Sequence, residues 1–141
     1  MKIAGLVKQS FIDYPDKMAC VLFTQGCNFR CGYCHNPSLV LPSLFGRNKL
    51  IPVDEVMAYL DSRRGWLEGV VITGGEPTIH GDLPDFIRQI HALGYSIKLD
   101  TNGTNPDMLQ SMLAERLLDF IAMDIKSIPD AAHYSQIIGK D

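Results

Sequence analysis

The stretch ACVLFTQGCNFRCGYC, residues 19–34, joins an apolar run to three closely spaced cysteines. Ala19–Thr24 is almost unbroken in its apolar character, which predicts a strand buried in a sheet. The strand leads directly into Cys27, Cys31 and Cys34, spaced Cys-x3-Cys-x2-Cys. The sequence therefore predicts a buried strand whose carboxyl end carries a metal-binding loop.

The number of cysteines in this loop indicates the kind of metal site. Iron–sulfur clusters are normally held by four cysteines. Three thiolates can hold three corners of a [4Fe–4S] cluster and leave the fourth iron without a protein ligand. We interpret the gap as an iron that binds a small molecule, with Cys27, Cys31 and Cys34 as metal ligands.

Zinc is the alternative that the cysteines leave open. Closely spaced cysteines often bind structural zinc, and Cys20 is available as a fourth ligand. However, Cys20 lies inside the apolar run, and free cysteine is among the most buried residue types. We therefore expect Cys20 in the core. A disulfide framework is disfavoured because such folds are short, secreted and rich in loops.

Strand-like and helix-like segments alternate along the rest of the chain. The expected strands are Ala19–Thr24, Gly69–Thr73, Tyr95–Thr101 and Phe120–Ile125, and the expected helices are Val53–Arg64, Leu83–Leu93, Asn105–Leu117 and Asp130–Ile138. This alternation predicts an α/β fold with a parallel sheet, in a single domain over residues 1–141. Ser38–Leu50 is expected to be the longest loop, a mobile flap beside the cysteines.

Polar residues follow each expected strand, at the edge where parallel β/α architectures place their active sites. They are Gly74, Gly75 and Glu76 after the second strand, Asp100 and Thr101 at the third, and Asp124 and Lys126 at the fourth. The two glycines would let a ligand approach closely, and Glu76 could accept a hydrogen bond from an ammonium group. The aspartates suit hydroxyls or a cation, and Lys126 suits a carboxylate. Each motif alone is also compatible with a turn or a surface ion pair.

Composition excludes several classes of function. With 46% apolar residues and a net charge of −3, the 141-residue chain resembles a globular domain without a nucleic-acid surface. No apolar run approaches the roughly 20 residues of a membrane span. Four cysteines without a secretory signal indicate a reducing compartment, so we expect a cytoplasmic protein that binds no membrane.

The cysteine motif, together with Gly-Gly-Glu-Pro at residues 74–77, resembles the radical S-adenosylmethionine (SAM) superfamily. Within it, the chain resembles the activases of glycyl radical enzymes, and among these the activating proteins of anaerobic ribonucleoside-triphosphate reductase. The supporting segments are Ser10–Pro15, Thr24–Phe29, His35–Pro37, Asp100–Gly103 and Met123–Lys126. The resemblance implies a partial (β/α) barrel of the radical SAM type.

The resemblance also implies a reaction. An electron from the reduced [4Fe–4S] cluster would cleave SAM to methionine and a 5′-deoxyadenosyl radical, which would take a hydrogen atom from a glycine of the partner enzyme. The residues implied to line the SAM site are Tyr33, Gly74, Gly75, Glu76, Asp100, Thr101, Asp124 and Lys126. A cation beside Asp100 and Asp124 and a flavodoxin or ferredoxin as reductant complete the expectation.

The chain departs from this family in two respects, of which the first concerns only a local turn and the second keeps other functions open. Asp16 stands where the family commonly has glycine, and the chain ends after about four β/α units, which predicts a truncated barrel. One alternative is a radical SAM enzyme that acts on a small molecule, of the carboxy-deazaguanine synthase type. The other is a non-catalytic iron–sulfur module.

Overall fold

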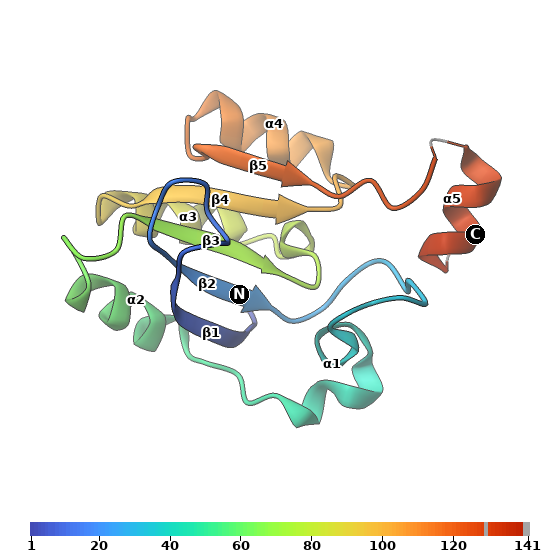
Figure 1. The fold of residues 1–141 in the computed structure, drawn as a ribbon, viewed down its shortest axis with the longest axis horizontal. Coiled ribbons are helices and arrows are strands. Elements are labelled where there is room, and N and C mark those ends of the chain that lie inside the picture. Colours follow the sequence, from blue (N-terminus) through green and yellow to red (C-terminus); the bar gives the residue numbers. More distant parts are fainter. Residues whose placement is uncertain (129, 140–141) are drawn as a thin grey trace.

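A five-stranded sheet forms the centre of the molecule in the computed structural model, which describes residues 1–128 and 130–139 (Figure 1). Its strands are β1 Ile3–Ser10, β2 Ala19–Thr24, β3 Gly69–Gly74, β4 Ser96–Thr101 and β5 Phe120–Met123. They lie in the order β1-β2-β3-β4-β5, with β1 antiparallel to β2 and all later neighbours parallel. This confirms the α/β fold with a mainly parallel sheet.

The register of the parallel strands brings their carboxyl ends to one edge. Thr24 at the end of β2 pairs with Gly74 at the end of β3, and Thr101 at the end of β4 pairs with Met123 at the end of β5. The polar segments that follow these strands therefore begin side by side. The strand ends thus place the candidate site at a single edge of the sheet.

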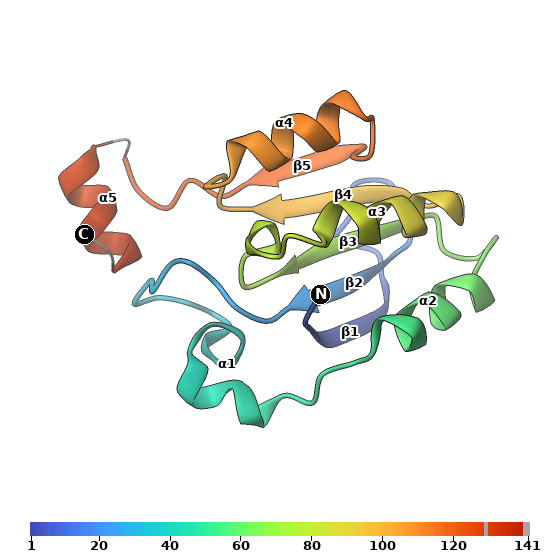
Figure 2. The ribbon, with the colours of Figure 1, turned by 180° about the vertical axis from the view of Figure 1, so that it is seen from behind.

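Three amphipathic helices cover one face of the sheet, as seen from behind in Figure 2. They are α2 Val53–Ser62, α3 Leu83–Ala92 and α4 Pro106–Ala114. Alternate side chains of the strands point toward them, as the period of two in a strand requires. The main core is formed by Cys20, Leu22, Val70, Ile72, Ile97 and Leu99 of the sheet with Val56, Leu60, Phe86, Ile87, Ile90, Leu109 and Met112 of the helices.

The opposite face of the sheet has a smaller apolar cluster. Ala19, Val21 and Val71 pack there with Tyr14, whose side chain is buried, and with the partly buried Phe23. Tyr14 comes from the turn between β1 and β2. This turn covers the face at the amino ends of the parallel strands, away from the candidate site.

Three short helices lie near the carboxyl-end edge. They are α1 Pro37–Val40, the 3-10 helix η1 Pro42–Arg47, and α5 Ala131–Ile138, which stands off from the sheet in Figure 1. The turn η2 Pro77–Ile79 follows β3. In the described part of the chain, every helix is too short or too polar to cross a membrane.

Three expectations from the sequence were wrong. The first strand, β1, was not expected, and Ser38–Leu50 is not an irregular loop because most of it forms α1 and η1. Several elements are also shorter than predicted: α2 ends at Ser62, α3 at Ala92, α4 at Ala114 and β5 at Met123, while β4, α4 and α5 each begin one residue late. The departure at Asp16 has a backbone consequence, since its φ of +59° is the left-handed conformation that favours glycine.

Candidate functional site

One cavity of about 200 Å³ opens at the carboxyl-end edge of the sheet. Its walls come from the cysteine loop and from the ends of β3, β4 and β5. All eleven residues that the sequence singled out line it: Cys27, Cys31, Tyr33, Cys34, Gly74, Gly75, Glu76, Asp100, Thr101, Asp124 and Lys126. The tertiary structure thus gathers residues that are almost 100 positions apart in the chain.

Backbone hydrogen bonds from three directions hold the cysteine loop. The Gly26 amide donates to the Leu39 carbonyl at 2.7 Å, and the Arg30 amide donates to the Ile138 carbonyl at 2.7 Å. Within the loop, the Cys34 amide donates to the Cys31 carbonyl at 3.1 Å. The loop is therefore fixed to both α1 and α5.

The cysteines separate into two groups, as predicted. Cys27, Cys31 and Cys34 are partly exposed at the cavity, whereas Cys20 is fully buried in the core on the helix side of the sheet. Burial raises the pKa of the Cys20 thiol to about 12, so it stays protonated. Cys20 is therefore a packing residue of the core, and it does not line the cavity that the other three cysteines share.

The donor set suits an iron–sulfur cluster better than a single metal ion. Among residues 1–128 and 130–139, no three His, Cys, Asp or Glu side chains are gathered as ligands of one ion. A four-iron cluster is larger than one ion, and its thiolates lie correspondingly farther apart. Cys27, Cys31 and Cys34 come from one loop and line one cavity, which suits three of the four cysteine positions of such a cluster.

The Cys27 sulfur has a hydrogen-bond donor nearby. The Phe29 amide donates to its Sγ at 3.3 Å. Burial raises the pKa of the Cys27 thiol, and this N–H acts in the opposite direction because it favours the thiolate. Bound iron would deprotonate the thiol in any case. Hydrogen bonds to cysteine sulfur also influence the reduction potential of iron–sulfur clusters.

Gly74 and Gly75 are needed because two backbone segments touch there. A Cβ on Gly74 would lie 2.3 Å from the Thr24 amide nitrogen, and one on Gly75 would lie 1.9 Å from the Gly26 carbonyl oxygen. The contact is sealed by hydrogen bonds from the Gly75 amide to the Thr24 carbonyl and from the Glu76 amide to the Gly26 carbonyl, 2.9 and 2.8 Å long. Positions 74 and 75 thus need glycine because the backbone before the cysteine loop lies against them. The sequence had instead suggested the close approach of a ligand as the reason for these glycines.

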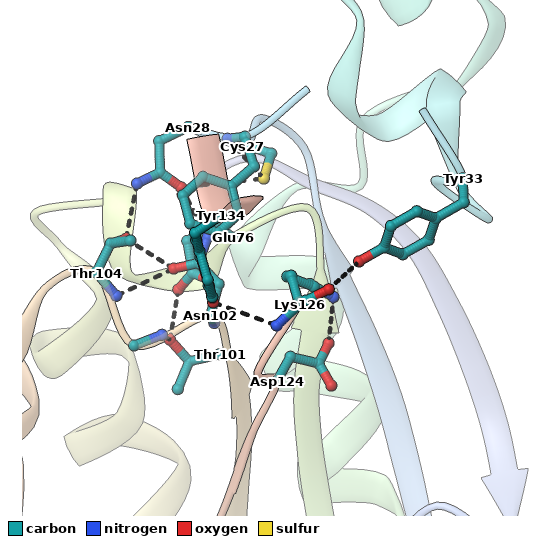
Figure 3. A network of polar contacts seen from close by, with 12 residues as sticks. Cys27, Asn28, Tyr33, Glu76, Thr101, Asn102, Thr104, Asp124, Lys126 and Tyr134 are labelled. Carbon is teal, nitrogen blue, oxygen red and sulfur yellow. Dashed lines mark hydrogen bonds and ion pairs between the residues drawn. The ribbon is translucent and has the colours of Figure 1, made fainter. Parts of the chain in front are cut away.

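The Glu76 carboxylate is buried, with 1% of the residue exposed, and accepts four hydrogen bonds. The donors are the Thr78 amide at 3.0 Å, the Thr78 hydroxyl at 2.6 Å, the Thr101 hydroxyl at 2.8 Å and the Asn102 amide at 2.7 Å. Figure 3 shows Glu76, Thr101 and Asn102 gathered together. The side chain therefore joins the end of β3 to the end of β4.

Side-chain amides extend this network to the cysteine loop. The Asn102 Nδ2 donates to the Asn28 Oδ1 at 2.8 Å, and the Asn28 Nδ2 donates to the Thr104 hydroxyl at 2.7 Å (Figure 3). Asn28 directly follows Cys27. The first cysteine is thereby tied to the same turn that Glu76 holds.

A second set of contacts lies across the cavity, where the chain leaves β5. The Tyr33 hydroxyl donates to the Lys126 carbonyl at 3.2 Å, and the Lys126 amide donates to the Tyr134 hydroxyl at 3.2 Å (Figure 3). The Phe29 ring contacts Tyr134 edge-on, with ring centroids 6.4 Å apart. These contacts connect the cysteine loop with the segment between β5 and α5.

The two aspartates of the cavity wall are each paired with a lysine. Asp100 is 2.6 Å from the Lys98 Nζ, and Asp124 is 2.6 Å from the Lys126 Nζ. Hydrogen bonding and charge attraction to Asp124 raise the pKa of Lys126, although desolvation opposes them and is the largest single contribution. Both aspartates that the sequence suggested for a cation thus have a lysine ammonium group as their partner.

Other residues that shape the site were not expected there, among them Lys98, Thr104 and Tyr134. Lys98 could have been found, because residues two apart on a strand share a face and Lys98 stands two positions before Asp100. Thr104 and Tyr134 gave no such signal. Their contacts with Asn28 and Lys126 depend on how distant segments meet.

Comparison with known proteins places the site in a family context. The family model described as "Radical SAM superfamily" matches residues 21–141. A protein of Methanocaldococcus jannaschii named as a glycyl-radical enzyme activating enzyme is 36% identical over 125 residues, 88% of this chain and 50% of that protein. The 7-carboxy-7-deazaguanine synthase of Aquifex aeolicus is 36% identical over 80 residues, 57% of this chain and 34% of that protein. The chain thus spans at most half the length of these relatives.

Among solved structures, the crystal structure of QueE from Escherichia coli has the same fold. The TM-score is 0.59 at 24% sequence identity, over 73% of this chain and 52% of that one. The likeness extends the agreement from sequence motifs to the arrangement of the strands.

Proposed function

The chain belongs to the radical SAM superfamily, and from this premise we propose that it is an activase that generates a glycyl radical on a partner enzyme. The observation that carries the SAM-cleaving part of the proposal is the cavity lined by three loop cysteines and by the polar ends of β3, β4 and β5, and the activating-enzyme relative supports the activase class. A cluster ligand set and a polar ligand site share this cavity. Such an arrangement suits a cofactor that reacts while it is bound beside the cluster.

Each wall of the cavity has its own part in the proposal. Cys27, Cys31 and Cys34 would hold a [4Fe–4S] cluster, which when reduced supplies the electron that cleaves SAM to methionine and a 5′-deoxyadenosyl radical. The remaining proposed SAM contacts are Tyr33, Gly74, Gly75, Glu76, Asp100, Thr101, Asp124 and Lys126. The backbone of residues 74–76 faces the cavity beside Cys27 and suits the methionyl amine.

The buried network around Glu76 has an orienting part in this proposal. Because all four of its hydrogen bonds come from the protein, the carboxylate holds the β4 turn in place whether or not SAM is bound. Asn102 and Asn28 transmit that position to the cysteine loop. A site that is rigid before the ligand arrives keeps the reacting atoms in register.

The proposed substrate is a glycine in a glycyl radical enzyme, and anaerobic ribonucleoside-triphosphate reductase is the proposed partner. The Methanocaldococcus relative supports the class of activases. The motifs at Ser10–Pro15 and Asp100–Gly103 favour an activase over a radical SAM enzyme that acts on a small molecule. A flavodoxin or ferredoxin as electron donor and a cytoplasmic, anaerobic setting belong to the same proposal.

A radical SAM enzyme that acts on a small molecule is the second candidate. It is favoured by the match to the Aquifex 7-carboxy-7-deazaguanine synthase. Both candidates cleave SAM at the same kind of site, so the geometry described above suits either. The atom that gives up hydrogen distinguishes them.

Isotope transfer tests the proposed function. The protein is reconstituted anaerobically with iron and sulfide, reduced with dithionite, and mixed with SAM and the glycine-loop peptide of an anaerobic ribonucleotide reductase, deuterated at the glycine Cα. Deuterium in 5′-deoxyadenosine and a glycyl radical signal in electron paramagnetic resonance are the expected results, and Cys31→Ala should give neither. SAM cleavage without deuterium transfer from the peptide would favour the second candidate.

A further inference from the structure

Lys98 forms an ion pair that is unusual for its depth in the molecule. Its ammonium lies 2.6 Å from the Asp100 Oδ1, and only 11% of the Lys98 side chain is exposed, against 30% for Asp100. Lysine is almost never buried unless it is paired. The pair is therefore a built feature of β4 and differs from a solvated surface contact.

The position of Lys98 explains why its ammonium meets Asp100. Ile97 and Leu99 point into the helix-covered core, so Lys98 and Asp100 share the opposite face of β4. Phe120 pairs with Lys98 across the sheet, and its ring centroid is 6.0 Å from the Nζ, within reach of a cation–π interaction. The ammonium is thus confined between an aromatic ring and a carboxylate.

Lys98 stands behind the cavity wall. Asp100, Asp124 and Lys126 line the cavity, whereas Lys98 is not among its lining residues. Asp124 has its own partner, because the Lys126 Nζ is 2.6 Å from its Oδ2. The two carboxylates on this wall are therefore balanced by two ammonium groups.

We propose that Lys98 is an internal counter-cation that orients and neutralises Asp100, so that the site needs no metal cation beside its aspartates. This proposal rests on the proposed function in one respect only, which is that SAM is named as the ligand that binds beside Asp100 and Asp124. An unpaired carboxylate at this depth would attract a small cation, because carboxylate oxygens are the ligands that such ions prefer. With Lys98 present, that position is taken by the ammonium. Lys98 is thus a positioning residue that acts through Asp100.

The test compares unfolding of the protein in three salts, without SAM or a partner. Urea unfolding is measured in potassium, magnesium and tetramethylammonium chloride at equal ionic strength, since tetramethylammonium is too large to enter the position of the ammonium. The variants are Lys98→Met, which keeps the length of the side chain, the double variant Lys98→Met/Asp100→Asn, and Lys49→Met, which removes an exposed positive charge.

The wild type and Lys49→Met are expected to unfold at the same urea concentration in all three salts. Lys98→Met should unfold about 1 M earlier in tetramethylammonium and regain part of that loss in potassium or magnesium. The double variant should fold and show no preference among the salts, because it has no carboxylate at position 100. If the double variant does not fold, the proposal is overturned. The double variant therefore remains a test where Lys98→Met alone folds in none of the three salts.

Two further results would also overturn it: a wild type stabilised by potassium or magnesium, or a Lys98→Met variant indifferent to them. SAM affinity is then measured on reconstituted wild type in the same salts and should differ by less than about twofold. Absence of SAM binding in every salt would count against the proposed function alone. The unfolding comparison decides the role of Lys98 independently.

Discussion

Gly75 lies so close to Gly26 that a Cβ on Gly75 would stand 1.9 Å from the Gly26 carbonyl oxygen. Gly75 directly follows β3, and Gly26 directly precedes Cys27. The backbone after β3 thus lies against the backbone before Cys27, and this contact fixes the position where the cysteine loop begins. Only glycine at position 75 allows the two backbones to come this close.

Gly75→Ala should prevent correct formation of the site. The new methyl group cannot be accommodated unless the two backbones separate, so we expect a loss of about 3 kcal/mol or more in the free energy of unfolding and poor iron loading. Gly81→Ala is the matched control, because a Cβ there meets nothing within 4 Å. Urea unfolding and iron content of both variants check this, and equal stability of the two would contradict it.

Glu76→Gln should destabilise the protein although it keeps the shape of the side chain. The amide would present an N–H₂ group where the carboxylate now accepts a hydrogen bond from an amide or hydroxyl donor. Loss of hydrogen bonds to a charged acceptor predicts a decrease of roughly 2–3 kcal/mol. Glu55→Gln, at an exposed position, should change stability by about 0.5 kcal/mol or less. A similar effect of both substitutions in denaturant unfolding would refute the network as a stabilising unit.

Cys31→Ala and Cys20→Ala should have opposite effects on the cluster. Cys31 lines the cavity, so its removal should abolish stable [4Fe–4S] loading and SAM cleavage. Cys20 is fully buried in the core, so its removal should leave the cluster intact and lower stability by about 1 kcal/mol through a small cavity. Iron and sulfide analysis and the reduced-cluster electron paramagnetic resonance signal measure both outcomes. Loss of the cluster in the Cys20 variant would overturn the ligand assignment.

His80 should make stability fall in mildly acidic solution. Burial lowers the pKa of its imidazole below the usual 6.5, although the Gln25 backbone and the Asp82 charge act in the opposite direction. Its Nε2 is buried without a hydrogen-bond partner among the described residues. Below pH 6.5 the unfolded chain takes up a proton that the folded protein resists, so the stability contributed by neutral His80 is lost as the pH falls toward the lowered pKa.

The comparison that checks this uses urea unfolding of the wild type and His80→Gln between about pH 7.5 and 5.5. The variant should lose less stability than the wild type over this range, since glutamine does not titrate. An identical decrease in both proteins would show that His80 does not contribute to it.

Arg116→Gly should stabilise the protein. Arg116 follows the end of α4 with a φ of +54°, and the Leu117 amide donates to the Met112 carbonyl at 2.9 Å, the pattern of a helix end that favours glycine. We expect a gain of about 0.5–1 kcal/mol in the free energy of unfolding. Arg116→Ala keeps a Cβ at the same backbone angle and should give no such gain. Thermal or urea unfolding of the two variants tests the difference.

The sequence was most informative where a segment lies in the middle of the sheet. β2 and β3 are covered on both faces, so their residues form nearly continuous apolar runs that are easy to recognise. β1 is an edge strand with two irregularities in its pairing and several exposed side chains, and its sequence has no clear alternation. The sequence does carry a signal for α1 and η1, because each begins with a proline at its first position, although both helices are too short for a clear apolar period.

The site shows the same division. Cys27, Cys31 and Cys34 could be proposed as metal ligands from spacing alone, because ligands on one loop are local in sequence. The role of Glu76 could not be predicted in this way. Its carboxylate accepts hydrogen bonds from Thr101 and Asn102, which lie 25 and 26 residues away in the sequence. Glu76 was predicted to face an ammonium group, whereas its four described hydrogen bonds are with the protein.

The sequence by itself determined the chemistry available to this protein: three cysteines on one loop, polar residues at consecutive strand ends, and the α/β alternation that brings such ends to one edge. These properties depend on local spacing and on the periodicity of side chains. Only the tertiary structure decided which groups satisfy one another, such as Glu76 with Asn102 and Lys98 with Asp100. A buried charge takes the nearest partner of suitable geometry, and strand register, helix packing and loop docking determine which group is nearest.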